Sequence, residues 1–358
     1  MSAKLMQILG FAVAIVAIQM FTQLTDNSFH LTQLTMTAYY SLLVIGLCML
    51  IGYAGQISLG HAGFFAIGGY ISAFLTTHDF SAMKSKPIVV LLSKLGFLVG
   101  RKDLYGAELL AFQPWGACII SVCTVLIVAY VIGGPVLKLK GHYLAMATLG
   151  FGIIIYRIVL GTSSLGSADG ISGVPGFTIL PGVTIGGNSS GKIMNYYVAW
   201  GILIAGMTLL LNLISSRVGR ALSAIHGAED AAEAMGIPTA NYKLRVFVLS
   251  AGFAAVAGVL LTHYNGSIGP SEASVMKSVR YVAIVAIGGM TSIWGAVSMS
   301  LILNYFSLRG SFGTYDDAVF GVILILIMLF APDGLLRTQV LSDLKSFFKR
   351  PGGKEVAL

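Results

Sequence analysis

The side chains best suited to binding a polar solute are gathered in residues 52–63, GYAGQISLGHAG, which lie between two apolar runs. The candidates are Gln56, Ser58, Gly60 and His61, whose side-chain and backbone groups can form hydrogen bonds. Within a bilayer, non-helical backbone is tolerated only where it is buried in protein or lines a cavity. We therefore expect either a broken helix beside a solute path or a tight packing turn in which His61 bonds to a neighbour.

Motifs for covalent catalysis, nucleotide binding and metal binding are incomplete in this sequence. Residues 186–192, GGNSSGK, fit the spacing of a phosphate loop, but Ile193 stands where such a loop needs Ser or Thr. The six histidines are scattered, and the three cysteines lie in apolar runs without a CxxC pair. The sequence therefore predicts a chain that is not an enzyme and that binds no metal or cofactor itself.

The composition is that of a protein embedded in lipid. Hydrophobic residues make up 56% of the 358 residues, charged residues only 10%, and the mean hydropathy is +0.86. Soluble domains contain about 25% charged residues, and a soluble fold could not hide this much apolar surface. We expect an all-α integral membrane protein, a polytopic helical bundle of about 8–10 transmembrane segments that include broken or re-entrant helices.

The apolar runs set the expected order of the membrane segments. They cover 5–24, 36–54, 64–75, 114–137, 143–160, 196–215, 246–264, 280–308 and 318–331. A second glycine-rich break at 287–295 splits one of these runs and echoes the first break. Within the mixed region 78–113, the apolar piece 88–99 is too short to span, which predicts a re-entrant or surface helix there.

A charged segment at 216–245 separates two of the spans and contains GRALSAIHGAEDAAEAMGIPTANYKL. Its spacing predicts two short helices, the second beginning with acidic residues that suit the positive end of a helix dipole. Gly236 and Pro238 form a strong helix stop. A short helix with a small apolar face formed by Ala231, Ala232 and Met235 would fit a groove on a partner; the alternative is an ordinary amphipathic loop.

Positive residues indicate the orientation of the chain, because cytoplasmic loops carry an excess of Lys and Arg. They mark the 216–245 segment at Arg217, Arg220, Lys243 and Arg245, and the turn before Tyr143 at Lys138 and Lys140. We expect both termini in the cytoplasm and the loop 161–195 outside. This predicts one membrane domain over 1–340 and a basic cytoplasmic tail at 341–358; the net charge of +8 reflects orientation and not nucleic-acid binding.

Acidic residues are scarce within the predicted spans. Carriers driven by a proton or sodium gradient usually need carboxylates at mid-membrane. The pair Asp316 and Asp317 lies beside a Gly/Tyr turn and is predicted to be a loop at the membrane edge. Energy for transport would then come from a partner, although a stand-alone carrier or channel remains the alternative from another class.

The chain resembles the permeases of ABC importers, in particular those for branched-chain amino acids of the LivM type. The stretches that carry the resemblance are 219–261, 52–70 (GYAGQISLGHAGFFAIGGY), 137–152 (LKLKGHYLAMATLGFG), 170–176 (GISGVPG), 287–295 and 331–335. Together they cover roughly residues 36–336. Residues 78–113 match no part of the family pattern.

The resemblance implies an import complex in a bacterial inner membrane. Its parts would be this permease, a second homologous permease, two cytoplasmic ATPase subunits that hydrolyse ATP, and a periplasmic substrate-binding protein. The residues that would contact the ATPase are Arg220, Glu229, Asp230, Ala231, Ala232, Glu233, Met235, Gly236 and Ile237. Closely similar permeases import urea and short-chain amides, so these solutes are the alternative cargo.

Overall fold

The computed structural model describes residues 3–25, 29–81, 97–102, 108–139, 141–180, 182–187, 191–311 and 313–330. Its long helices are α1 (Ala3–Leu24), α2 (Phe29–Ala54), α5 (Pro114–Val136), α6 (His142–Gly161), α7 (Lys192–Ser215) and α10 (Thr239–Asn265). Within the described residues, these six are long and apolar enough to cross a membrane. Shorter helices are α3 (His61–Thr77), α11 (Val275–Gly288), α12 (Ile293–Leu308) and α13 (Asp316–Phe330). The expected polytopic helical membrane protein with broken helices is thus confirmed.

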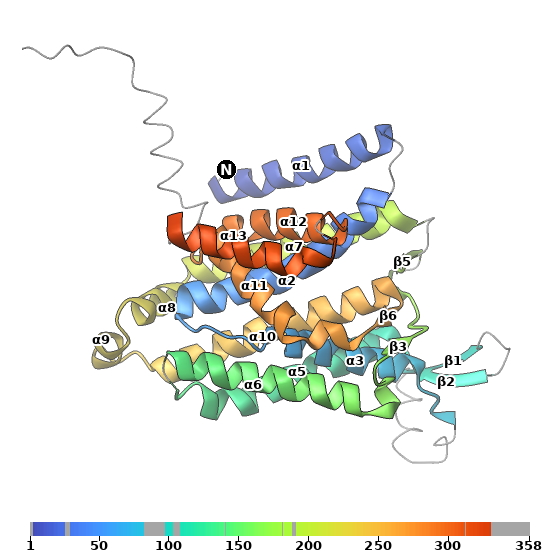
Figure 1. Cartoon of the computed structure of the whole chain (residues 1–358), viewed down its shortest axis with the longest axis horizontal. Helices are drawn as coiled ribbons and strands as arrows, with labels where there is room; N and C mark the ends of the chain where they lie inside the picture. The colour runs from blue at the N-terminus through green and yellow to red at the C-terminus, as the bar shows by residue number, and fades with distance from the viewer. Residues whose placement is uncertain are drawn as a thin grey trace, which may run out of the picture.

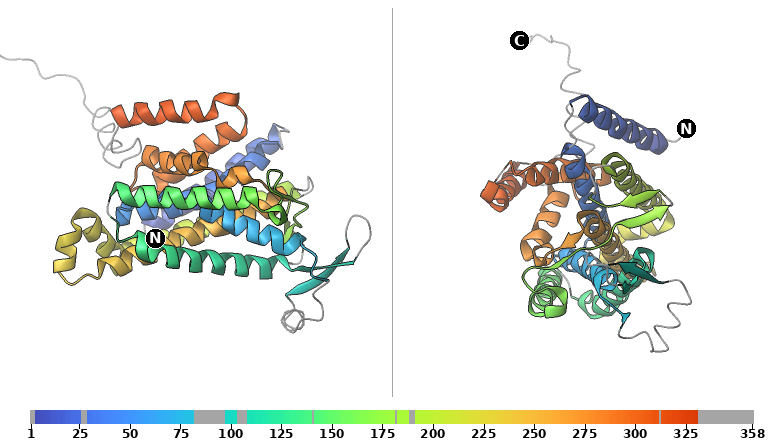
Figure 2. Two further views of the ribbon diagram at one scale, coloured as in Figure 1. Left: turned by 60° about the horizontal axis from the view of Figure 1, so that its bottom comes forward. Right: turned by 90° about the vertical axis from the view of Figure 1, so that its right-hand side faces the viewer.

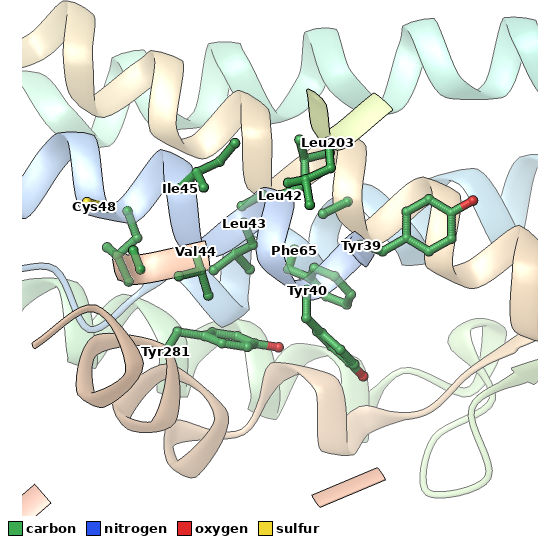
Figure 3. Packing of buried hydrophobic residues seen from close by; sticks show 14 of the residues in the cluster. Tyr39, Tyr40, Leu42, Leu43, Val44, Ile45, Cys48, Phe65, Leu203 and Tyr281 are labelled. Carbon is green, nitrogen blue, oxygen red and sulfur yellow. The ribbon is translucent and has the colours of Figure 1, made fainter. Parts of the chain in front are cut away.

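Helix α2 forms the centre of the bundle. It contacts α7, α10, α11 and α12, and 94% of the residues in its apolar 18-residue stretch are buried. A helix that is apolar all round belongs in the interior, and Leu43, Val44 and Ile45 are completely buried on successive faces (Figure 3). The bundle is therefore built around one helix near the start of the chain.

Small residues let α3 and α10 approach closely. A Cβ added at Gly258 of α10 would lie 2.1 Å from the carbonyl oxygen of Phe65 in α3. Small residues at such positions let helix backbones come together where lipid provides no hydrophobic drive for association. Some of the 44 glycines of the chain therefore serve close contacts between helices.

Helix α1 lies at the edge of the bundle, where Figure 2 (right) shows it outside the other helices. Only 17% of the residues in its apolar 18-residue stretch are buried, and its neighbours are α7 and α2. It is attached through the hydroxyl of Tyr196, which donates to the carbonyl of Ile15 at 3.0 Å, and through Phe11, whose ring packs edge-on to Trp200. The rest of its surface is left for lipid or another chain.

Short strands gather at one end of the bundle (Figure 1). They form antiparallel pairs of β1 (Leu98–Lys102) with β2 (Glu108–Phe112), β3 (Ile171–Ser172) with β6 (Ser267–Ile268), and β4 (Phe177–Leu180) with β5 (Val183–Ile185). The expected helix at 88–99 is wrong for its last three residues, because residue 97 is non-helical and residues 98 and 99 belong to β1; residues 82–96 lie outside the described part. Hydropathy alone did not show that residues 98–102 pair with residues 108–112.

The segment 216–245 lies at the opposite end from these strands, as does the beginning of α1 and the end of α13 (Figures 1 and 2). The described parts of the loop 161–195 and the segment 216–245 therefore lie at opposite ends of the bundle, and which end faces the cytoplasm stays a prediction. The tail 341–358 lies outside the described residues, so its placement stays a prediction.

Candidate coupling surface and solute path

The segment 216–245 folds into two short helices, α8 (Arg217–Gly227) and α9 (Glu229–Ala234), followed by the start of α10. The hydroxyl of Ser216 caps α8 by accepting a hydrogen bond from the Val218 N–H at 3.1 Å. Leu222 and Ile225 are buried one turn apart, whereas Arg220 is exposed on the other face. The predicted pair of helices is confirmed, and α8 is anchored by its apolar face.

Helix α9 ends where the sequence predicted. Gly236 has a φ of +82°, the left-handed conformation that glycine adopts without strain. The Ile237 N–H donates to the Ala232 carbonyl at 3.1 Å, which closes the last turn. Met235, next to this turn, is 84% exposed. The end of α9 therefore presents a large apolar side chain to the surroundings.

Some of the predicted coupling residues are exposed, and others hold α9 in place through buried or paired side chains. Ala232 is 5% exposed and packs inward, so it does not share one exposed face with Ala231 and Met235. Glu229 forms an ion pair of 2.5 Å with Lys243 of α10. The exposed members of the set are Arg220, Asp230, Ala231, Glu233, Met235 and Gly236, while Ile237 is half-buried.

The first glycine-rich break begins at the end of α2 and touches α8. Helix α2 ends at Ala54, and residues 55–60 are non-helical before α3 begins at His61. A Cβ added at Gly55 would lie 2.9 Å from Nδ1 of His226 in α8. The expected break in the helix is confirmed, and α8 rests directly against it.

The polar side chains of this break have different surroundings. His61 is 1% exposed, with Nδ1 3.0 Å from Oγ of Ser58 and Nε2 2.7 Å from Oγ of Ser250 in α10. These are the contacts that the packing-turn alternative requires of His61. Gln56 is 2% exposed, and neither its side-chain oxygen nor its nitrogen has a hydrogen-bond partner among the described residues.

Unsatisfied buried amides are costly, so the side chain of Gln56 calls for a ligand or water. Gly60 has a different surrounding: it precedes α3 and lies against α6, where an added Cβ would be 2.6 Å from the Thr148 carbonyl oxygen. Among the four predicted path residues, Gln56 is thus the one with open hydrogen-bonding capacity, and Ser58 and His61 bond to each other.

The second glycine-rich break lies against the first. Helix α11 ends at Gly288, and α12 begins at Ile293. The hydroxyl of Tyr53 donates to the Thr291 carbonyl at 2.7 Å, and a Cβ at Gly52 would be 1.8 Å from the Met290 carbonyl oxygen. The two breaks that echo each other in sequence are therefore in direct contact, and the first of them also contacts α8.

A cluster of charged side chains lies near the beginning of α11, away from the second break. Lys277 pairs with Glu272 at 3.1 Å, and Arg280 pairs with Asp316 at 3.4 Å. The prediction that Asp316 lies in a loop is wrong, because this residue begins α13 and faces a cation of α11.

The sequence contained one signal for this cluster. Lys277 and Arg280 are three residues apart, a spacing that places two side chains on one face of a helix. The apolar run was expected to start at residue 280, which left Lys277 in a loop, whereas α11 starts at Val275.

In the described part of the chain, no group of three or more His, Cys, Asp or Glu could hold a metal ion.

Comparison with known proteins gives a consistent set of relatives. Residues 29–331 match the family described as branched-chain amino acid transport system / permease component. The chain is 29% identical to the high-affinity branched-chain amino acid transport system permease protein LivM of Salmonella typhimurium, with 84% of this chain and 68% of that protein covered. No solved structure matches the chain at a significant level.

Two further relatives carry similar names. The permease protein BraD of Pseudomonas aeruginosa is 28% identical, with 85% of this chain and 93% of BraD covered. The permease protein LivH of Escherichia coli is 29% identical, with 84% of this chain and 92% of LivH covered. The names of both describe a high-affinity branched-chain amino acid transport system.

Proposed function

Because the chain belongs to the family of branched-chain amino acid transport permeases, we propose that it is the membrane-spanning subunit of an ATP-driven importer of these amino acids. In this proposal the bundle forms part of the translocation path, and separate ATPase subunits bind α8 and α9. ATP is hydrolysed on those partners, and this chain binds no cofactor. The observation that carries the proposal is the exposed pair of helices α8 and α9. Helix α8 contacts the first glycine-rich break, and that break contacts the second.

The contacts provide a route by which motion at the surface reaches the interior. His226 of α8 lies against Gly55 at the start of the first break. Tyr53, two residues earlier, bonds to Thr291 in the second break. A displacement of α8 by a partner would therefore act on the ends of α2 and α11 together, because non-helical segments can change conformation at lower cost than intact helices.

The partners follow from the same reasoning. We propose a complex with two cytoplasmic ATPase subunits, a second homologous permease and a periplasmic binding protein, in the inner membrane of a bacterium. The similarity of this chain to both LivM and LivH of Escherichia coli supports pairing of two related permeases. The end with α8 and α9 faces the cytoplasm in this arrangement, together with both termini, and the loop 161–195 faces the periplasm.

The test compares two exposed apolar residues at the same end of the bundle. Met235→Glu places a carboxylate at the proposed ATPase interface, whereas Leu139→Glu makes the same chemical change in the turn after α5, where Leu139 is 42% exposed. We expect Met235→Glu to lower uptake of leucine by about tenfold or more, because burying an unpaired charge costs more than the 1.4 kcal/mol that a tenfold change represents. Leu139→Glu should retain uptake.

The readouts are uptake in cells that depend on this permease and recovery of ATPase subunits with the affinity-purified chain. Met235→Glu should reach the membrane in normal amounts and lose the ATPase subunits. Uptake by Met235→Glu equal to that of Leu139→Glu would exclude α9 as the coupling surface. Transport by this chain alone in nucleotide-free vesicles would overturn the importer assignment and favour a stand-alone carrier.

A further inference from the structure

A polar cavity of about 300 Å³ lies among α2, α11, α12 and α13, separate from the coupling helices and from the break at 52–63. Its lining includes Tyr40, Lys277, Arg280, Tyr281, Asn304 and Asp316. Pockets for small ligands begin at about this volume. A cavity lined by hydroxyl and amide groups and by three charged side chains is unusual inside an apolar bundle and requires an explanation.

The charges of this cavity are arranged as two pairs. Nζ of Lys277 is 3.1 Å from Oε1 of Glu272 and 3.3 Å from the hydroxyl of Tyr40. Arg280 contacts Asp316 and also donates to Oγ of Ser307 at 2.9 Å. The four charges of the cluster therefore sum to zero, and paired groups of both signs lie at one cavity.

Several polar atoms of the cluster remain unsatisfied. Within the residues that the structure describes, Oη of Tyr281 and Oδ1 of Asp316 have no hydrogen-bond partner although both atoms are buried. Tyr281 is 1% exposed, and Figure 3 shows its ring directed from α11 toward Tyr40. Leaving buried polar groups unpaired is costly. Their capacity fits a solute that brings its own donors and acceptors.

We propose that this cavity binds the charged head of a zwitterionic amino acid, with its carboxylate at Lys277 and Arg280 and its ammonium at Asp316. The hydroxyl of Tyr281 completes the hydrogen bonds of the head group. A zwitterion can contact groups of both signs and adds no net charge to the cavity, whereas a carboxylate or an amine alone would add an uncompensated charge. This inference rests on the proposed import function and specifies which solute chemistry the permease accepts.

The position of the cavity connects it with the coupling surface. Lys277, Arg280 and Tyr281 belong to α11, whose other end is the second glycine-rich break. That break contacts the end of α2, which in turn contacts α8. A shift of α11 driven from the coupling helices would therefore move the charged groups relative to Tyr40 of α2, and this would weaken the hold on the solute.

The decisive experiment uses Tyr281→Phe, with Tyr39→Phe as the matched control. Both hydroxyls are buried and lack a partner among the described residues, but Tyr39 does not line the cavity. Leucine uptake and leucine-stimulated ATPase activity are measured with the complete complex and its binding protein in proteoliposomes. We expect Tyr281→Phe to lower leucine uptake by about tenfold, the effect of losing one hydrogen bond to a charged group, and Tyr39→Phe to leave it unchanged.

A second variant separates ligand binding from structural support. Arg280→Met combined with Asp316→Leu removes both members of one ion pair, a change that buried structural pairs often tolerate. The purified complex should keep its thermal stability and lose leucine uptake. Normal uptake in this double variant and in Tyr281→Phe would overturn the proposed site.

Ligand chemistry provides an independent arm of the test. Leucine should raise the thermal stability of the purified complex, whereas 4-methylpentanoate, which lacks the ammonium, and 3-methylbutylamine, which lacks the carboxylate, should not. Stabilisation by all three, or by none, would contradict a zwitterion site. A wild-type complex that does not import leucine with ATP would instead refute the import function itself, so the two failures are distinguishable.

Discussion

Gly52 provides the sharpest test of the contact between the two glycine-rich breaks. In Gly52→Ala, the new Cβ would lie 1.8 Å from the carbonyl oxygen of Met290 and 2.5 Å from its carbonyl carbon. Real Cβ contacts are essentially never below 3.0 Å, so this separation must increase from 1.8 Å to at least 3.0 Å. Both obstructing atoms belong to the backbone and cannot be relieved by a change of rotamer.

The cost is that of overpacking a tight contact, about 1–3 kcal/mol. The displacement would also disturb the hydrogen bond from Tyr53 to Thr291, because both residues are next to the contact. We therefore expect Gly52→Ala to lower the free energy of unfolding by about this amount and to reduce leucine uptake. The ATPase subunits should still co-purify, since α8 and α9 are unaltered.

The measurements are thermal unfolding in detergent and uptake in cells, with Gly134→Ala as the control. Gly134 is inside α5, and an added Cβ there would have no neighbour within 4 Å. Replacing a helical glycine with alanine stabilises by about 0.5–1 kcal/mol when space permits. Equal stability and uptake in the two variants would refute the claim that the breaks depend on close contact.

Two further substitutions examine the polar groups of the first break. Ser250→Ala should lower the free energy of unfolding by about 1–3 kcal/mol, because Nε2 of the buried His61 loses its partner; the control Ser215→Ala, at an exposed residue, should unfold as the wild type in the same thermal assay. Gln56→Leu should leave thermal stability equal or higher, since neither side-chain polar atom has a partner in the described structure, and should reduce leucine uptake. Normal uptake by Gln56→Leu would remove Gln56 from the solute path.

Local patterns in the sequence predicted the features that depend on near neighbours along the chain. The left-handed turn at Gly236, the acidic first turn of α9 and the interruption after Ala54 all follow from residues within one or two helical turns. The order of apolar helices follows from hydropathy in the same way. These features were predictable because their causes lie within a few residues of one another.

Features formed by distant residues were not predictable from these patterns. Arg280 and Asp316 are 36 residues apart, and the contact between Tyr53 and Thr291 spans 238 residues. Averaging hydropathy over a window also hides isolated charges such as Lys277 at the start of an apolar helix. The pairing of β3 with β6 joins two loops on either side of α7–α10, and neither short strand carries a pattern of its own.

The deep burial of α2 has a consequence for synthesis of the protein. Its neighbours α7, α10, α11 and α12 all follow it in the chain, so α2 is made before any of the helices that later enclose it. The hydroxyls of Thr35, Thr37 and Ser41 each donate to a carbonyl four residues earlier in the same helix, at 2.7–2.8 Å. These polar groups are thus satisfied without neighbours, which allows the nascent helix to reside in lipid until the rest of the bundle has been inserted.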